Sequence, residues 1–255
     1  MSSVKIMAMM WLVAAALGVS ASKSITHIKT KTNTENKGFA VVELFTSEGC
    51  SSCPPADAVI AKIEKESTDK PVYILAFHVD YWNRLGWKDV FSSADYSHRQ
   101  NQYANWLHLQ SVYTPQVVVN GHTEFVGSEE GTLRNTIKTN LEKTPAANLM
   151  LSDIKTDGGK VSVQYHTQGN TSNDVLLLAV IEKHAQSNVQ RGENSGRTLS
   201  HVQIVRAFTS TPVKSDNGDA SITLPKGFDA KGFELIAFLQ NPANGEISGA
   251  AKAEF

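Results

Sequence analysis

The type of secondary structure that the sequence predicts changes part-way along this 255-residue chain, and this change constrains the fold most. Over residues 39–145, apolar runs of strand length alternate with segments of helical periodicity, in the order β-α-β-α-β-β-α. Beyond Pro145, strand follows strand, with Gly, Asn and Asp between them. The first pattern is typical of α/β domains and the second of sandwiches and barrels. We therefore expect an α/β domain over 39–145 and a mostly antiparallel β-sandwich or barrel-like domain over 146–255.

Apolar periodicity and turn residues set the expected bounds of each element. In the first region we expect strands at Ala40–Phe45, Val72–Phe77, Gln116–Val119 and Thr123–Val126, and helices at Ala56–Glu66, Ser93–Leu109 and Thr132–Lys143. In the second region we expect strands at Leu149–Lys155, Lys160–His166, Val175–Glu182, His201–Phe208, Ser221–Leu224, Phe233–Gln240 and Glu246–Ala253.

The only two cysteines, Cys50 and Cys53, lie between the first expected strand and the first expected helix. A helix N-terminus presents free N–H groups and a partial positive charge, which stabilise a thiolate. The spacing lets Cys53 reach Cys50 and resolve a mixed disulfide. A bridge that closes so short a loop constrains the unfolded chain little, which argues against a purely structural disulfide. The pair therefore predicts thiol–disulfide chemistry.

The N-terminus is typical of an export signal. Lys5 precedes a run of 12 apolar residues, Ile6–Leu17, and small residues follow up to Ala21. This run is shorter than the ~20 apolar residues of a membrane-spanning helix, although an uncleaved anchor is the alternative. We expect a signal peptide over 1–21 and a polar leader over 22–38. The mature protein would be periplasmic or secreted, with no stable membrane anchor.

The charge balance argues against nucleic-acid binding. The chain has 24 Lys and Arg residues against 25 Asp and Glu residues, a formal net charge of -1. A nucleic-acid-binding protein would instead show a basic patch or stripe. Cysteine-bearing proteins are the expected partners, and the motifs imply no cofactor.

The segment Val42–Asp57 (VELFTSEGCSSCPPAD) and the order of elements resemble the thioredoxin superfamily. In that fold a cis-proline opens the third strand and faces the cysteine pair, and the matching position is Thr114-Pro115. The longer string is similar to a family of exported bacterial thioredoxin-like proteins of unassigned function, with the signature Glu-Leu-Phe-Thr-Ser-x-Gly-Cys-x-x-Cys-Pro-Pro-Ala-Asp. Further matching segments are Phe77–Asp89, Tyr113–Gln116 and Gly192–His201.

This resemblance implies a thioredoxin-like domain over 39–145 in which Cys50 exchanges with the substrate and Cys53 resolves. Thr114 and Pro115 would hold the substrate strand by backbone pairing. Such a site requires that Cys50 be reachable from solvent and that Pro115 lie near it in a cis peptide bond. If Cys50 were sealed from solvent, the likeness to thioredoxins would indicate a shared scaffold only and not the enzymatic function.

Three further residues are candidates for proton transfer or for tuning the thiolate. Glu43 lies in the first strand, close to where thioredoxins keep a buried acid, and a salt-bridged or strand-edge carboxylate is the alternative. His78 and Asp80 follow the second strand, at the edge where α/β sheets place their sites. A hydrogen bond that fixes the loop is the alternative for these two.

The second region has its densest polar cluster around the turn Asn194-Ser195-Gly196. The members of this cluster are Glu193, Asn194, Arg197, Thr198 and His201. This cluster is either a hydrogen-bonded turn between strands or a segment that folds back over the cysteine edge and shapes a substrate cleft.

The expected function is that of an exported thiol–disulfide oxidoreductase that acts on cysteine-bearing proteins. Two alternatives use the same residues differently. Reduced Cys50 and Cys53 with His78 could bind copper(I), since soft sulfur ligands favour that ion. The chain could also be a non-catalytic thioredoxin-like binding module with an inert disulfide.

Overall fold

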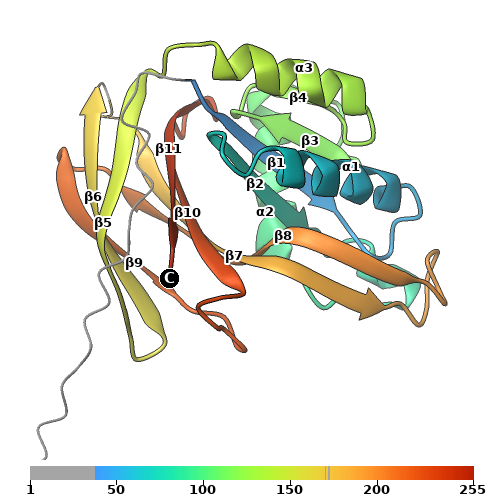
Figure 1. Ribbon diagram of the computed structural model, residues 1–255. Helices are drawn as coiled ribbons and strands as arrows, with labels where there is room; N and C mark the ends of the chain where they lie inside the picture. Colours follow the sequence, from blue (N-terminus) through green and yellow to red (C-terminus); the bar gives the residue numbers. More distant parts are fainter. Residues whose placement is uncertain (1–37, 170, 172) are drawn as a thin grey trace, which may run out of the picture.

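The computed structural model describes residues 38–169, 171 and 173–255 (Figure 1). The expected signal peptide over 1–21 and residues 22–37 of the expected leader lie outside the described residues. Within the described part, no helix is long and apolar enough to cross a lipid bilayer.

Helices and strands alternate up to residue 141, and only strands follow. The first group comprises β1 (Ala40–Thr46), α1 (Cys53–Glu66), β2 (Val72–His78), the 3-10 helix η1 (Asn83–Leu85), α2 (Ala94–Trp106), β3 (Gln116–Val119), β4 (Thr123–Val126) and α3 (Glu130–Leu141). The second comprises β5 (Ala147–Asp157), β6 (Lys160–Gly169), β7 (Val175–Asn188), β8 (Thr198–Pro212), β9 (Asn217–Thr223), β10 (Phe233–Gln240) and β11 (Ile247–Glu254).

One large mixed sheet takes strands from both groups, in the order β11-β10-β7-β8-β2-β1-β3-β4. Its two parts join where β8 pairs in parallel with β2, with Ile204 opposite Ala76. The remaining strands form a three-stranded sheet, β5-β6-β9. The fold is therefore mixed α/β, mostly strands, and the large sheet continues across the domain boundary expected at residue 145. The division into two domains stays a prediction.

Alternating side chains along the strands bury both faces of the large sheet. On β1, Val42 and Leu44 pack against α1 and α3, while Val41 and Phe45 share a second core with side chains of α2. The side chains of β7 alternate in the same way, since Leu178 faces a third core that includes residues of the small sheet. The layers in Figure 1 follow from this alternation: α1 and α3 cover one face beside the small sheet, and α2 lies behind.

The β7–β8 hairpin extends beyond the rest of the sheet. Strand β7 pairs with β10 only as far as Glu182, whereas its pairing with β8 continues to Asn188, opposite Thr198. The hairpin thus ends in a two-stranded arm, drawn in orange in Figure 1, that passes below the start of α1. We call residues 189–197, which join the two strands, the hairpin tip. The arm brings this tip to the turn that carries the cysteines.

Candidate functional site

The two cysteines form a disulfide at the start of α1. Strand β1 ends at Thr46, a turn follows, and the helix begins at Cys53, with prolines in its first turn, where no intrahelical N–H partner is lost. Within the turn, the Cys53 N–H donates to the Cys50 carbonyl at 3.2 Å. The Cα atoms of the pair are 5.4 Å apart. The disulfide therefore lies where free helix N–H groups favour a thiolate once it is reduced.

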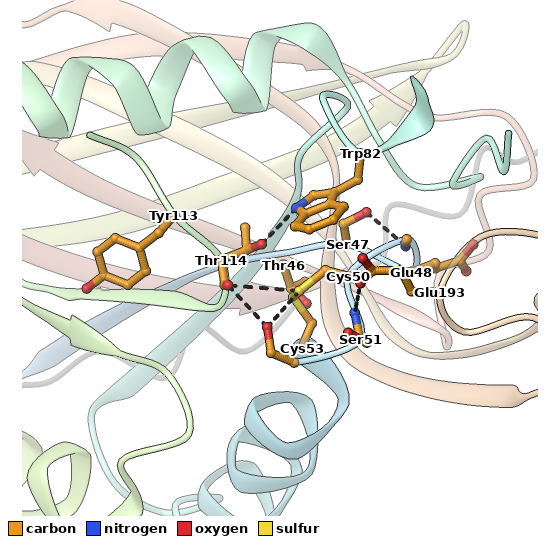
Figure 2. The surroundings of a disulfide bond; sticks show 12 residues. Thr46, Ser47, Glu48, Cys50, Ser51, Cys53, Trp82, Tyr113, Thr114 and Glu193 are labelled. Atoms are coloured by element: carbon orange, nitrogen blue, oxygen red, sulfur yellow. Dashed lines mark hydrogen bonds between the residues drawn. A yellow bond between two sulfur atoms is a disulfide. The ribbon is translucent and has the colours of Figure 1, made fainter. Parts of the chain in front are cut away.

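The Thr114–Pro115 peptide faces this disulfide and is cis, as expected from the sequence. The Thr114 carbonyl oxygen lies 3.9 Å from Cys50 Sγ and accepts a hydrogen bond from Ser52 Oγ at 3.4 Å (Figure 2). The indole N–H of Trp82 donates to Thr114 Oγ1 at 2.8 Å and so holds this segment from the other side. We call residues 47–52 the cysteine turn and residues 113–115, which lead into β3, the Thr114 segment. These two segments and the loop between β2 and α2 thus meet at one place.

The expectation that Cys50 is reachable from solvent is wrong for this structure. Both Cys50 and Cys53 are 0% exposed, although Ser51 and Ser52 between them are exposed. Three segments pack against the cysteine turn: the Thr114 segment at Cys50 Sγ, the loop that carries Trp82 at Gly49, and the hairpin tip at the backbone of residues 48–51.

Two residues of the hairpin tip bind the backbone of the cysteine turn. The Asn194 side-chain amide donates to the carbonyls of Glu48 and Cys50, both at 2.9 Å. The Glu193 carboxylate accepts a hydrogen bond from the Ser51 N–H at 2.9 Å, which lowers the pKa of Glu193. The structure thus places the polar cluster of the second region against the cysteine edge, which is the fold-back arrangement considered from the sequence.

Glu43 lies in a buried ion pair. Its carboxylate accepts hydrogen bonds from the guanidinium of Arg99, at 2.8 Å for Nη2, and from the hydroxyl of Tyr103 at 2.5 Å. Burial acts to lower the pKa of Arg99, but the charges and hydrogen bonds of Glu43 and Tyr103 together outweigh it, so that this pKa is raised. These contacts match the salt-bridged alternative for Glu43 and leave its role in proton transfer without geometric support.

His78 and Asp80 make the contacts of loop-fixing residues. His78 Nδ1 lies 2.7 Å from Asp89 Oδ2, in the loop before α2. Burial acts to lower the pKa of His78, but the charge and hydrogen bond of Asp89, with the charges of Asp57 and Glu48, raise it overall. Burial acts to raise the pKa of Asp89, but the charge and hydrogen bond of His78, with two backbone N–H groups, lower it overall. Asp80 accepts a hydrogen bond from Ser97 Oγ at 2.5 Å.

Four acidic or imidazole groups surround His78, and of these only His201 was singled out from the sequence, as part of the polar cluster. They are Glu48, Asp57, Asp89 and His201, and all are buried or nearly so. His201 Nε2 lies 3.6 Å from Glu48 Oε1, and His201 Nδ1 lies 3.8 Å from Asp57 Oδ2. For Asp57 the available signal was its position four residues after Cys53, which lies on the same helix face because α1 begins at Cys53.

A protein-family model identifies the relatives of this chain. The family of proteins of unknown function designated DUF1223 matches residues 41–240. The chain belongs to this family. Its matched region includes the cysteine turn, the Thr114 segment and the hairpin tip, so the site described above lies within the family region. No protein with curated annotation matches the chain.

Two solved structures are similar to this DUF1223 protein over most of its length. A crystal structure of a protein from Agrobacterium tumefaciens has 26% sequence identity and a TM-score of 0.66, covering 84% of this chain and 93% of that one. HBP35 of Porphyromonas gingivalis has 18% identity and a TM-score of 0.62, covering 86% of this chain and 76% of that one. The second likeness concerns the fold alone.

In chemical terms, the site of this DUF1223 protein combines a disulfide with buried ionisable groups. A disulfide can accept two electrons, and the adjacent carboxyl and imidazole groups can accept or donate protons. Among the described residues, no group of three or more His, Cys, Asp or Glu side chains is placed to hold a metal ion. Copper(I) binding by Cys50, Cys53 and His78 stays a prediction.

Proposed function

We propose that this protein is an exported thiol–disulfide oxidoreductase that acts on cysteine-bearing protein substrates. One observation carries the proposal: the Cys50–Cys53 disulfide lies at the first turn of α1 and faces the Thr114 carbonyl at 3.9 Å. The helix start favours a thiolate, and the adjacent backbone offers hydrogen-bonding groups for a substrate strand. The thioredoxin-like fold expected from the motifs is part of this proposal.

The reaction transfers two electrons between the pair and a substrate. In the reducing direction, the Cys50 thiolate attacks a substrate disulfide, forms a mixed disulfide and releases one substrate thiolate. The Cys53 sulfur then attacks Cys50 Sγ, which forms the internal disulfide and releases the second substrate thiolate. A dithiol reductant restores the reduced pair. With a disulfide oxidant in its place, the same steps run in reverse and oxidise a substrate dithiol.

Complete burial of both cysteines meets the condition under which the likeness to thioredoxins would reduce to a shared scaffold. The proposal therefore requires an open state, in which the enclosing segments have moved and a sulfur atom can be attacked. The hairpin tip is the segment best suited to move, since its hold on the cysteine turn consists of a few hydrogen bonds from Glu193 and Asn194. Local opening of such a segment costs less free energy than global unfolding.

The direct test is turnover of a self-quenched fluorescent disulfide peptide with dithiothreitol as reductant. We expect the wild-type protein to accelerate reduction. The variant Cys50→Ser should lose this activity, and Cys53→Ser should trap a mixed disulfide with the peptide that mass spectrometry detects. Urea unfolding of each variant checks that the fold is retained. Wild-type turnover no faster than that of the doubly substituted protein would overturn the proposal.

The buried disulfide also favours a second candidate, a non-catalytic binding module whose disulfide is inert. An enclosed disulfide is protected from attack, because exchange requires direct access of a thiolate to sulfur. This candidate predicts that the disulfide stays oxidised in millimolar dithiothreitol while the protein is folded. Thiol labelling followed by mass spectrometry distinguishes the two candidates.

A further inference from the structure

Asp57 is a nearly buried carboxyl group one helical turn after the resolving cysteine. It lies four residues after Cys53 on α1, and residues with this spacing share a helix face, with Cβ atoms about 5–6 Å apart. The side chain of Asp57 is 10% exposed, and its Oδ1 accepts a hydrogen bond from Thr46 Oγ1 at 3.0 Å. Figure 2 places Thr46 directly beside the disulfide. Asp57 is thus bound to a residue at the disulfide and follows Cys53 by one helical turn.

His201, from β8, lies on the other side of Asp57. His201 Nδ1 lies 3.8 Å from Asp57 Oδ2, and His201 Nε2 lies 3.6 Å from Glu48 Oε1; both distances are too long for hydrogen bonds. Both nitrogens are buried and have no hydrogen-bond partner among the described residues. The His78 ring packs edge-on against the His201 ring, with centroids 4.8 Å apart. The His201 ring therefore lies between two carboxylates and is near enough to interact electrostatically with both.

The titratable groups that face Asp57 come from four other parts of the chain. His78 on β2, Asp89 before α2 and His201 on β8 act on Asp57 directly, and Glu48 in the cysteine turn lies at the other nitrogen of His201. Glu43, the acid singled out from the sequence, is not one of them, because its carboxylate is held by Arg99 and Tyr103.

We propose that Asp57 accepts the proton of Cys53 when that cysteine resolves the mixed disulfide, with His201 as a positioning residue that balances the charge of Asp57. This inference rests on the proposed function. In the step, the Cys53 S–H bond breaks and its proton passes to Asp57, the Cys53–Cys50 bond forms, and the bond from Cys50 to the substrate breaks with release of a thiolate. The proton later leaves to solvent.

The environment of Asp57 suits a proton acceptor for a thiol. Burial raises the pKa of Asp57, opposed by His201, His78 and the hydrogen bond from Thr46. A carboxyl group with a raised pKa is a stronger base than an ordinary aspartate and is better matched to a thiol.

The test separates the two chemical steps of the reduced protein in a single turnover with the fluorescent disulfide peptide. Formation of the mixed disulfide is measured in the Cys53→Ser background, with and without Asp57→Asn. Release of the second peptide thiol is measured with both cysteines present. We expect Asp57→Asn to leave the first step unchanged and to slow release at least about tenfold at pH 7. The defect should shrink as the pH approaches the ordinary thiol pKa of about 8.5, since solvent then removes the proton.

A carboxylate on the same helix provides the matched control. Glu64→Gln removes a charge from α1 outside the cluster and should leave both steps unchanged. If the Cys53→Ser protein forms no mixed disulfide at all, the proposed function fails. If it does, and Asp57→Asn releases the thiol at the wild-type rate with the wild-type pH profile, only the inference about Asp57 fails.

A second variant keeps the test decisive should Asp57→Asn disturb folding. Thr46→Val is nearly isosteric and removes the hydroxyl that donates to Asp57, a hydrogen bond that holds the pKa of Asp57 down. The acidic limb of the pH profile for thiol release should therefore move to higher pH. An unmoved limb in a folded Thr46→Val protein would contradict the role of Asp57.

Discussion

The side-chain amide of Asn194 donates a hydrogen bond to the backbone carbonyl of Cys50 at 2.9 Å, although 144 residues separate the two in the chain. The same amide also binds the carbonyl of Glu48, and its oxygen accepts a hydrogen bond from Arg197 at 2.8 Å. One buried side chain therefore ties the hairpin tip to the turn that carries the disulfide. This link makes the tip a candidate for control over access to the cysteines.

Substitution of Asn194 should expose the disulfide more often. Asn194→Ala removes the two hydrogen bonds from the tip to the cysteine turn, each worth about 0.5–1.5 kcal/mol, so the tip should open roughly 5- to 150-fold more often. We expect the rate of disulfide reduction by dithiothreitol in the folded protein to rise by about the same factor. Thiol labelling at timed intervals measures this rate.

The neighbouring residue offers a control on the same tip. Ser195 is exposed, and among the described residues its hydroxyl binds only the Gln190 carbonyl within the tip. The disulfide of Ser195→Ala should therefore be reduced by dithiothreitol at the wild-type rate. Equal rates for wild-type protein and Asn194→Ala would mean that the tip does not limit access to the disulfide.

The buried pair of Glu43 and Arg99 should contribute to stability and not to exchange chemistry. Arg99→Met leaves the Glu43 carboxylate buried without its cation, which typically costs about 3–5 kcal/mol. The Arg99 guanidinium also packs against the rings of Phe77 and Phe208, so part of the loss comes from these contacts. Urea unfolding measures the change in the free energy of unfolding.

The double variant Glu43→Leu with Arg99→Met distinguishes the stability lost with the ion pair from the stability lost when one buried charge is left unpaired. It should lose much less stability than Arg99→Met alone, since no charge remains buried. Glu43→Gln should lower stability while thiol release from the mixed disulfide keeps its wild-type pH profile. A profile altered in Glu43→Gln would instead support proton transfer by Glu43.

The sequence predicted the elements around the cysteines well because their signals are local. The strands Gln116–Val119 and Thr123–Val126 have the expected bounds, since a β-branched run and an Asn-Gly turn define them. Helix α1 begins at Cys53, three residues before the expected start at Ala56, because prolines are accommodated in a first helical turn.

The environment of the disulfide could not be predicted because it depends on contacts between distant segments. The expected strands ended at Glu182 and began again at His201, whereas β7 runs to Asn188 and β8 starts at Thr198. The additional residues are mostly polar and partly exposed, so they lack the apolar pattern that identifies buried strands. This arm is what carries the hairpin tip to Cys50 and places His201 beside Asp57.

The ion pair of His78 and Asp89 predicts how stability changes with pH. The pKa of His78 is raised above its ordinary value of 6.5, so its contribution is complete below pH 6.5 and is lost as the pH rises through the raised pKa. The pKa of Asp89 is lowered from 3.8, so its contribution is present above that pH and is lost as the pH falls through the lowered pKa. The pair should therefore stabilise the protein most between about pH 4 and 6.5.

The variant His78→Asn tests this dependence, since its amide can still donate to Asp89 but does not titrate. The difference in free energy of unfolding between wild type and variant should be largest near pH 5–6 and should decrease toward pH 8. Urea titrations at several pH values measure it. A difference that is constant or that grows with pH would contradict the raised pKa of His78.

The turn between β3 and β4 tests whether the two groups of strands unfold together. Gly121 has a φ of +76°, and a Cβ atom there would lie 1.8 Å from the carbonyl oxygen of Gly245 in the β10–β11 turn. Gly121→Ala should therefore cost roughly 2–4 kcal/mol from backbone strain and overpacking. Gly131→Ala is the control: it lies in α3 with no atom within 4 Å of the added Cβ, and should stabilise the protein by about 0.5–1 kcal/mol.

Two optical probes distinguish joint from separate unfolding. The tryptophans in the described part of the chain, Trp82, Trp87 and Trp106, all precede residue 145, so their fluorescence reports on the first region, whereas far-ultraviolet circular dichroism reports on both. Because β2 pairs with β8 and one core takes side chains from both regions, we expect the two probes to give coincident transitions, shifted to lower urea concentration together in Gly121→Ala. A dichroism transition that persists after the fluorescence change would instead support two independent domains divided near residue 145.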